Sequence, residues 1–225
     1  MPSSVNDNTY TVAQLYRTVK KIDHFDGGLK YTDEEQGKYH SFFGFLNRLL
    51  YPRNFLWYDG LNCEVKAMNI VKAEARHIPG MLRLLGQVGQ VHREIRPDIF
   101  RDGALKYDET ALKALLLEEK KPIFIGEDGG RVLGYCFCVL KDYRGSGVQT
   151  DRVELYIDDL CVDEESRGKG VATALYGYVK DFAKGIGCSH ISLNVWCGND
   201  NAQKFYEKMG MKPRSITMEQ WLEES

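Results

Sequence analysis

The stretch Val153-Glu-Leu-Tyr-Ile-Asp-Asp-Leu-Cys-Val162 carries the pattern on which the fold prediction depends. Apolar side chains alternate with polar ones as far as Ile157, and the alternation resumes one position out of phase at Leu160. Side chains of a regular strand alternate between two faces, so a slip of one position indicates a β-bulge. We therefore expect a bulged strand here, splayed from a neighbouring strand beyond the bulge.

A glycine-containing loop follows this strand and opens the next helix. It reads Arg167-Gly-Lys-Gly170, followed by a valine and an alanine. Glycines let backbone N–H groups converge at a helix N-terminus, where unpaired donors and the helix dipole favour an anion such as a pyrophosphate. The phosphate loop of nucleotide triphosphatases is excluded, because Asp163 stands where its first glycine belongs. We expect an anion-binding loop beside a cleft, with a solvated turn as the alternative.

Composition places the chain among soluble globular proteins. Its 225 residues, 43% hydrophobic and 28% charged, suffice for one large domain or a domain with a smaller extension. A net charge of −2 argues against a general nucleic-acid binder, whose affinity depends on neutralising many phosphates. No apolar run approaches the ~18 residues of a membrane span, and residues 1–20 lack an apolar signal-peptide core. We expect a cytoplasmic protein without a nucleic-acid or membrane partner.

The cysteines and histidines lack the spacing of metal ligands. Six cysteines occur without a Cys-x-x-Cys pair, and the five histidines include no His-Glu-x-x-His sequence. We expect buried, reduced thiols and no metal cofactor.

The first 65 or so residues differ in their pattern of apolar residues from the rest of the chain. Two short amphipathic helices are expected there, the second ending at Pro52. Its apolar stripe consists of Phe42, Phe45, Leu46, Leu49 and Leu50. The aromatic segment 54–60 follows as a strand or a docking segment. Because such stripes usually belong to a core, we expect residues 1–65 to form an N-terminal helical extension that packs on a domain spanning residues 66–225.

From Glu64 onward, strand patterns alternate with helix patterns. The elements expected before the bulged strand are a strand near 65–71, a helix from about 76 that ends before Pro97, a helix over 109–119 and a hairpin at Asp128-Gly-Gly130. Those expected after the loop are a helix ending near Gly185, a parallel strand over 188–196, a short helix over 199–210 and a last strand at 215–218.

Three separated motifs resemble the GCN5-related N-acetyltransferase (GNAT) superfamily. They are Ile157-x-x-Leu160-x-Val162, Arg167-x-x-Gly170-x-Ala172 and Asn199-x-x-Ala202-x-x-Phe205-Tyr206-x-x-x-Gly210-Met211. The resemblance covers residues 66–220 and implies an α/β (α+β) GNAT fold: a mixed, twisted sheet of about six to seven strands, splayed at the bulge and flanked by helices. It also implies acetyl-CoA in the V-shaped gap and direct acetyl transfer to a primary amine.

The resemblance carries roles to individual positions. It implies that backbone groups of Leu160, Cys161 and Val162 bind the pantetheine arm as a neighbouring strand would. The main-chain N–H groups that would hold the pyrophosphate belong to Arg167, Gly168, Lys169, Gly170, Val171 and Ala172. Asn199 matches a position near the pantetheine, and Tyr206 matches the tyrosine that protonates the departing CoA thiolate. A core aromatic is the alternative for Tyr206.

The proton acceptor stays open among three carboxylates. An alkyl ammonium has a pKa near 10.4, so removing its proton at pH 7 costs about 4.6 kcal/mol and needs an acceptor. Resemblance to the polyamine acetyltransferases implies Asp158 as the base, acting through a water, and Asp159 as a contact for the substrate cation. Glu154 instead matches the glutamate of ribosomal-protein alanine acetyltransferases. Only a bulge lets both aspartates face one cleft, and the alternative is one solvated acid and one structural acid.

The expected function is therefore acetyl transfer to a small cationic amine or a peptide or protein amine. The thiol of Cys161 is not expected to act as a nucleophile, because a thiol turned into the core is inert. A non-catalytic acyl-CoA sensor or partner-binding module is the alternative, and a homodimer stays open. His92 and Arg96, at the end of a predicted helix, are either acceptor contacts or surface residues.

Overall fold

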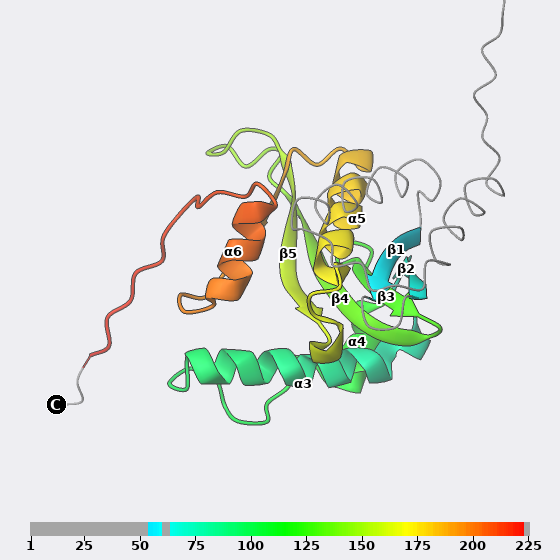
Figure 1. The fold of residues 1–225 in the computed structure, drawn as a ribbon. Coiled ribbons are helices and arrows are strands. Elements are labelled where there is room, and N and C mark those ends of the chain that lie inside the picture. The colour runs from blue at the N-terminus through cyan, green and yellow to red at the C-terminus, as the bar shows by residue number, and fades with distance from the viewer. Residues whose placement is uncertain (1–53, 60–63, 223–225) are drawn as a thin grey trace, which may run out of the picture. The chain divides into compact units, whose positions relative to one another are not determined.

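The computed structural model describes residues 54–59 and 64–222, all within the compact unit Leu46–Ser225. They contain a six-stranded sheet in the order β1-β2-β3-β4-β5-β6 (Figure 1). Neighbouring strands are antiparallel except for β5 and β6, which are parallel. The strands are β1 Asn54–Asp59, β2 Glu64–Lys72, β3 Ile123–Asp128, β4 Arg131–Asp142, β5 Val153–Val162 and β6 His190–Leu193. The predicted mixed sheet is confirmed.

The sheet begins closer to the N-terminus than the predicted domain boundary. That boundary falls inside β2, and β1 pairs with β2 from Asn54 opposite Asn69 to Asp59 opposite Glu64. The aromatic segment predicted as a strand or a docking segment is therefore an edge strand of the sheet. Residues 1–53 of the predicted helical extension lie outside the described residues.

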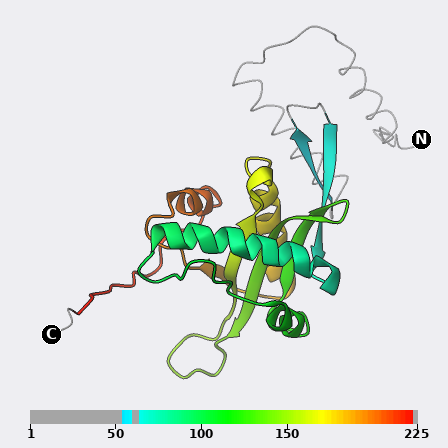
Figure 2. The ribbon, with the colours of Figure 1, turned by 90° about the horizontal axis from the view of Figure 1, so that it is seen from below.

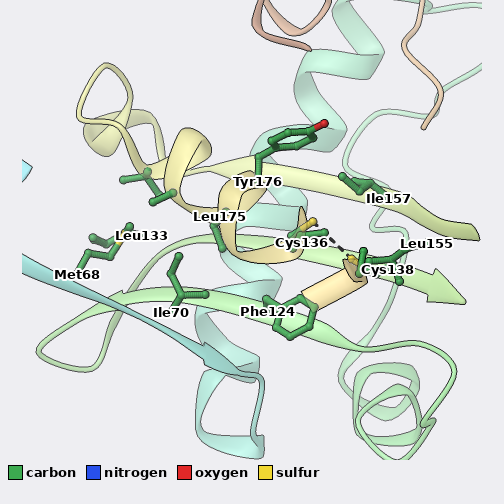
Figure 3. Packing of buried hydrophobic residues seen from close by; sticks show 14 residues of the cluster. Met68, Ile70, Phe124, Leu133, Cys136, Cys138, Leu155, Ile157, Leu175 and Tyr176 are labelled. Atoms are coloured by element: carbon green, nitrogen blue, oxygen red, sulfur yellow. Dashed lines mark hydrogen bonds between the residues drawn. The ribbon is translucent and has the colours of Figure 1, made fainter. Parts of the chain in front are cut away.

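Helices cover both faces of the sheet (Figure 2). They are α3 Ile78–Ile95, α4 Glu109–Leu115, α5 Val171–Gly185 and α6 Asp200–Lys208. Buried side chains of α5 pack with Met68, Phe124 and Leu155 in one core cluster, part of which Figure 3 shows together with the adjacent thiols of Cys136 and Cys138. Buried side chains of α3 and α4 form the second cluster, which contains Tyr135 and Phe137 of β4. The sheet thus has a core on each face.

Two predicted elements are shorter in the structure, and a third does not form. Helix α4 ends at Leu115, before the charged run that precedes Pro122, and β6 is shorter than predicted. Residues 215–218 form no strand and have exposed side chains. The predicted hairpin is confirmed, because Gly129 and Gly130 adopt φ of 54° and 87° between β3 and β4.

The predicted bulge lies in the middle of β5. Phe137 pairs with Asp159 and Cys138 pairs with Ile157, so Asp158 has no partner across the ladder. As a result, Leu155 and Ile157 before the bulge and Leu160 and Val162 after it all pack in the α5 cluster. The β6 ladder pairs only Glu154 to Ile157 of β5, so the outer edge of residues 158–162 has no strand beside it in the described part of the chain. This unpaired edge lies beyond the bulge, where the sequence predicts that β5 splays from a neighbouring strand.

A buried carboxylate holds the loop that leaves β5. The side chain of Asp163 is 1% exposed and accepts hydrogen bonds from Arg83 at 2.6 Å, Arg131 at 2.8 Å and Gln87 at 3.0 Å. Burial alone would raise the pKa of Asp163, but these hydrogen bonds outweigh it and lower the pKa to about 2. Its backbone N–H donates to Leu133 at 2.9 Å, which fixes the loop to β4.

We expect Asp163→Asn to lower the free energy of unfolding at pH 7 by about 1–3 kcal/mol, because it weakens hydrogen bonds to a buried charge. The pKa is lower in the folded state than in the unfolded chain, so this stabilisation is present above pH ~4 and is lost as the pH falls toward ~2. Denaturant unfolding of the native protein and the variant at pH 7 and near pH ~2 measures the change in free energy of unfolding.

Asp142→Asn is the control, since the pKa of Asp142 is also lowered to about 2, by Arg144, but at an exposed position. Its loss of stability should be much smaller. Equal losses in the two variants would contradict the anchoring role of Asp163.

Candidate active site

At residues 160–162 the open edge of β5 has unpaired main chain, while Cys161 is buried and Leu160 and Val162 are half-buried. Cys161 is 6% exposed, and its thiol donates to the carbonyl of Leu84 at 3.5 Å. Burial raises the pKa of this thiol to about 12, so it stays protonated and a poor nucleophile. Leu160 and Val162 pack against the α5 cluster. The backbone of these three residues is therefore the part that an extended ligand could pair with.

The loop after β5 has the backbone geometry of an anion site. Gly168 and Gly170 have φ of 76° and 81°, a region that other residues rarely adopt, and Gly170 is the N-cap of α5. The first turn of α5, which begins at Val171 and Ala172, has N–H groups without intrahelical acceptors. Arg167 lies 3.6 Å from Glu164, and Lys169 stands between the two glycines. The loop can thus bind an anion through its main chain.

The side chain of Asp158 is bound from the segment before α4. Lys106 Nζ lies 2.8 Å from Asp158 Oδ2 and 3.3 Å from the carbonyl oxygen of the same residue. The hydroxyl of Tyr107 donates to the same Oδ2 at 3.2 Å. The Tyr107 ring stacks on Phe137 of β4, with 5.6 Å between centroids, which fixes the direction of the hydroxyl. The extra residue of the bulge therefore carries an ion-paired carboxylate.

Asp159 has a different environment although it is the next residue. Its Oδ2 accepts a hydrogen bond of 3.0 Å from Tyr135, whose ring packs edge-on against Phe137. Burial raises the pKa of Asp159 to about 6, although the charge of Lys106 and the Tyr135 hydroxyl act in the opposite direction. The structure thus brings Asp158 and Asp159 together, one ion-paired and one titrating near neutral pH.

Glu154 lies apart from this pair, in the part of β5 that pairs with β6. Its side chain is 3% exposed and accepts from Ser192 at 2.5 Å and lies 3.0 Å from His190 Nε2. Arg214 and Lys141 lie at 3.4 Å and 3.7 Å. Burial would raise the pKa of Glu154, but the Ser192 hydrogen bond and these cations lower it. Its oxygens already have partners, as expected of a carboxylate that holds β6 to β5.

The two predicted site residues that follow β6 in the chain, Asn199 and Tyr206, both belong to α6 or its N-cap. Asn199 is the N-cap of that helix, and its Oδ1 accepts from the backbone of Ala202 at 3.2 Å. Tyr206 packs beside Tyr176 of α5, with 6.4 Å between ring centroids. Burial raises the pKa of Tyr206 well above its usual value, with smaller contributions from Cys136 and Asp159. Tyr206 therefore keeps its proton at physiological pH.

Several residues of the site have no signature in the sequence. Lys106, Tyr107 and Tyr135 reach the two aspartates from elements distant in the chain, and no local pattern marks them. Near them, His92 stacks on Phe100 at 5.0 Å, and Phe100 packs edge-on against Trp196 at 5.3 Å. Burial and the charge of Lys106 lower the pKa of His92.

Three further features concern metal ligands, membrane-spanning helices and free thiols. Among residues 54–59 and 64–222, no group of three or more potential metal ligands occurs. No helix in this part of the chain is long and apolar enough to span a membrane. Cys136, Cys138 and Cys161 are buried free thiols as predicted, whereas Cys197 is exposed.

The chain is similar to known acetyltransferases. The family model described as Acetyltransferase (GNAT) family matches residues 90–211. The chain is 32% identical over 130 residues to N-alpha-acetyltransferase 30 of Schizosaccharomyces pombe, a match that covers 58% of this chain and 83% of that protein.

Solved structures resemble the chain as well. A tetramutant of the BH1408 protein from Bacillus halodurans superposes with a TM-score of 0.65 at 28% identity, covering 68% of this chain and 99% of that one. The aminoglycoside N-acetyltransferase AAC(6')-Iy, solved in complex with CoA, shares the fold at a TM-score of 0.50 and 17% identity, covering 68% of this chain and 94% of that one. The chain therefore belongs to the GNAT family and is an acetyl-CoA-dependent N-acetyltransferase.

Proposed function

We propose that this enzyme transfers the acetyl group of acetyl-CoA directly to a peptide or protein amine at the bulge of β5. The observation that carries the proposal is the pair Asp158 and Asp159 beside the open strand edge, with Tyr206 on the neighbouring α6. In this proposal the pantetheine arm pairs with the backbone of residues 160–162, and the pyrophosphate binds the loop 167–172. The acceptor amine then meets the thioester at the end of the open edge.

The pair of aspartates supplies the proton acceptor. A base works best when its pKa lies near the working pH, which favours Asp159, whose pKa is raised to about 6. Raising a carboxyl pKa from its usual value to about 6 makes proton transfer from the amine easier by about 3 kcal/mol. We therefore assign Asp159 as the base and Asp158 as the contact for the cation, the reverse of the sequence-based expectation. The buried, fully partnered Glu154 holds the β5–β6 ladder in this scheme.

Tyr206 supplies the proton for the leaving group. As the amine attacks the thioester carbonyl, the C–S bond breaks and the CoA thiolate needs a proton. The raised pKa of Tyr206 keeps the phenol protonated, so it is available as a donor. No acyl-enzyme is needed, and the thiol of Cys161, bonded to Leu84, takes no part.

The acceptor class rests on the likeness to an N-alpha-acetyltransferase that extends over most of that relative. With a panel of peptide N-termini, polyamines and aminoglycosides, we expect the highest kcat/KM for a peptide. Tyr206→Phe is the control and should lower turnover of every acceptor by about 10- to 1000-fold with unchanged acetyl-CoA binding. Preference for a polyamine or an aminoglycoside would overturn the acceptor class, and full activity of the variant would overturn the role of Tyr206.

The cofactor loop can be tested with two glycines of equal strain at opposite ends of α5. Gly170 and Gly187 have φ of 81° and 78°, so valine at either position strains the backbone. Gly170→Val should nearly abolish acetyl-CoA binding in calorimetry, because the side chain also enters the anion site. Gly187→Val should lower stability without weakening binding, and Arg167→Ala should weaken it only modestly. Equal losses of binding in the two glycine variants would contradict the main-chain anion site.

The pH dependence distinguishes the two aspartates. If Asp159 is the base, kcat/KM should rise with pH through an apparent pKa of about 6, and Asp159→Asn should remove this limb. Tyr135→Phe should shift the limb to higher pH. The hydrogen bond from Tyr135 lowers the pKa of Asp159, so removing this bond raises that pKa. Asp158→Asn should shift it to lower pH, since the negative charge of Asp158 raises that pKa. Loss of the limb in Asp158→Asn, with its retention in Asp159→Asn, would reassign the base to Asp158.

A further inference from the structure

An ammonium group of the protein itself lies where the acceptor amine is expected. Lys106 Nζ donates to the carboxylate and the carbonyl of Asp158 at 2.8 and 3.3 Å. Asp158 directly precedes Asp159 and the open edge of residues 160–162. A substrate ammonium that approached this carboxylate pair would need the position that Lys106 Nζ holds.

The Lys106 side chain is held loosely. It is 42% exposed, and its partner Asp158 is 25% exposed. Ion pairs at this exposure contribute about 0–1 kcal/mol, so the amine can leave the carboxylate at small cost.

We propose that Lys106 is an internal acceptor, which the enzyme acetylates when acetyl-CoA is bound and no external amine occupies the site. This inference rests on the proposed function of the carboxylate pair. The Lys106 ammonium gives one proton to the pair, and the neutral amine attacks the thioester carbonyl. The C–N bond forms and the C–S bond breaks as Tyr206 protonates the CoA thiolate. The nitrogen then loses its second proton, which restores the Tyr206 hydroxyl. The products are N-acetyl-Lys106, CoA and one proton released to solvent.

Acetylation changes the site that carries it. An N-acetyl-lysine has no charge, so the ion pair with Asp158 is lost. The carboxylate then has only the hydroxyl of Tyr107 as a partner among the side-chain hydrogen bonds of the described residues. The modified enzyme would present a free negative charge to an incoming cationic acceptor.

The full-length chain can be incubated with acetyl-CoA alone, and acetylated lysines mapped by mass spectrometry while CoA release is followed. We expect about one equivalent of CoA, acetylation concentrated at Lys106, and a first-order rate independent of protein concentration. Lys106→Arg keeps a cation beside Asp158 and should abolish the release. A rate that rises with protein concentration, or release that persists in Lys106→Arg, would overturn the proposal.

Lys113 is a matched control for uncatalysed acetylation. Its amine lies 2.7 Å from Glu109 and is 61% exposed, so it is as well paired as Lys106 and more accessible. Selective modification of Lys106 supports the proposal, and equal or greater modification of Lys113 overturns it. In Gly170→Val, which lacks the anion site, acetylation of Lys106 should fall to the rate seen at Lys113.

The outcomes also distinguish this inference from the proposed function. Acetylation of an external peptide with no acetyl group on Lys106 would overturn the internal acceptor and leave the proposed function intact. Absence of acetyl-CoA binding in calorimetry would overturn the proposed function itself. The two experiments therefore distinguish a failure of the internal-acceptor proposal from a failure of the proposed function.

Discussion

The unpaired residue in the β4–β5 ladder is the constraint on which the rest of the site depends. Because Asp158 has no partner on β4, the apolar residues before and after it keep one face toward α5. A regular strand would turn Leu160 and Val162 to the other face and leave the core beneath α5 unfilled. The same slip ends the ladder with β6 and leaves a strand edge open. One extra residue thus preserves the core and creates the gap.

The loop beyond the gap depends on charge that is buried elsewhere. Asp163 forms ion pairs with Arg83 and Arg131, and these two arginines fix the start of the loop. The glycines that shape the anion site take no part in these ion pairs. An anion bound at the start of α5 would then meet main-chain donors already in place, which lowers the entropy lost on binding. The anchor and the anion site are therefore separate groups on one short segment.

The sequence was sufficient to predict features that depend on neighbouring residues. The slip in alternation located the bulge, and the glycines at 168 and 170 located the loop, because both act through local backbone geometry. The contacts of Lys106 with Asp158 and of Tyr135 with Asp159 span 52 and 24 residues, so no spacing reveals them. Glu154 could be placed on the strand, but its burial depends on partners from β4, β6 and the C-terminal segment.

Burial and charge pairing separate the roles of two neighbouring carboxylates. Exposure keeps the pair of Asp158 and Lys106 weak, at about 0–1 kcal/mol. Burial of Asp159 shifts its protonation by about 3 kcal/mol, despite the opposing charge of Lys106 and the Tyr135 hydroxyl. The burial of Asp159, which follows from the backbone position set by the bulge, thus contributes more free energy than the exposed ion pair of Asp158 with Lys106. In the proposed mechanism, the exposed Lys106 can therefore give way to the acceptor cation, while Asp159 serves as the base.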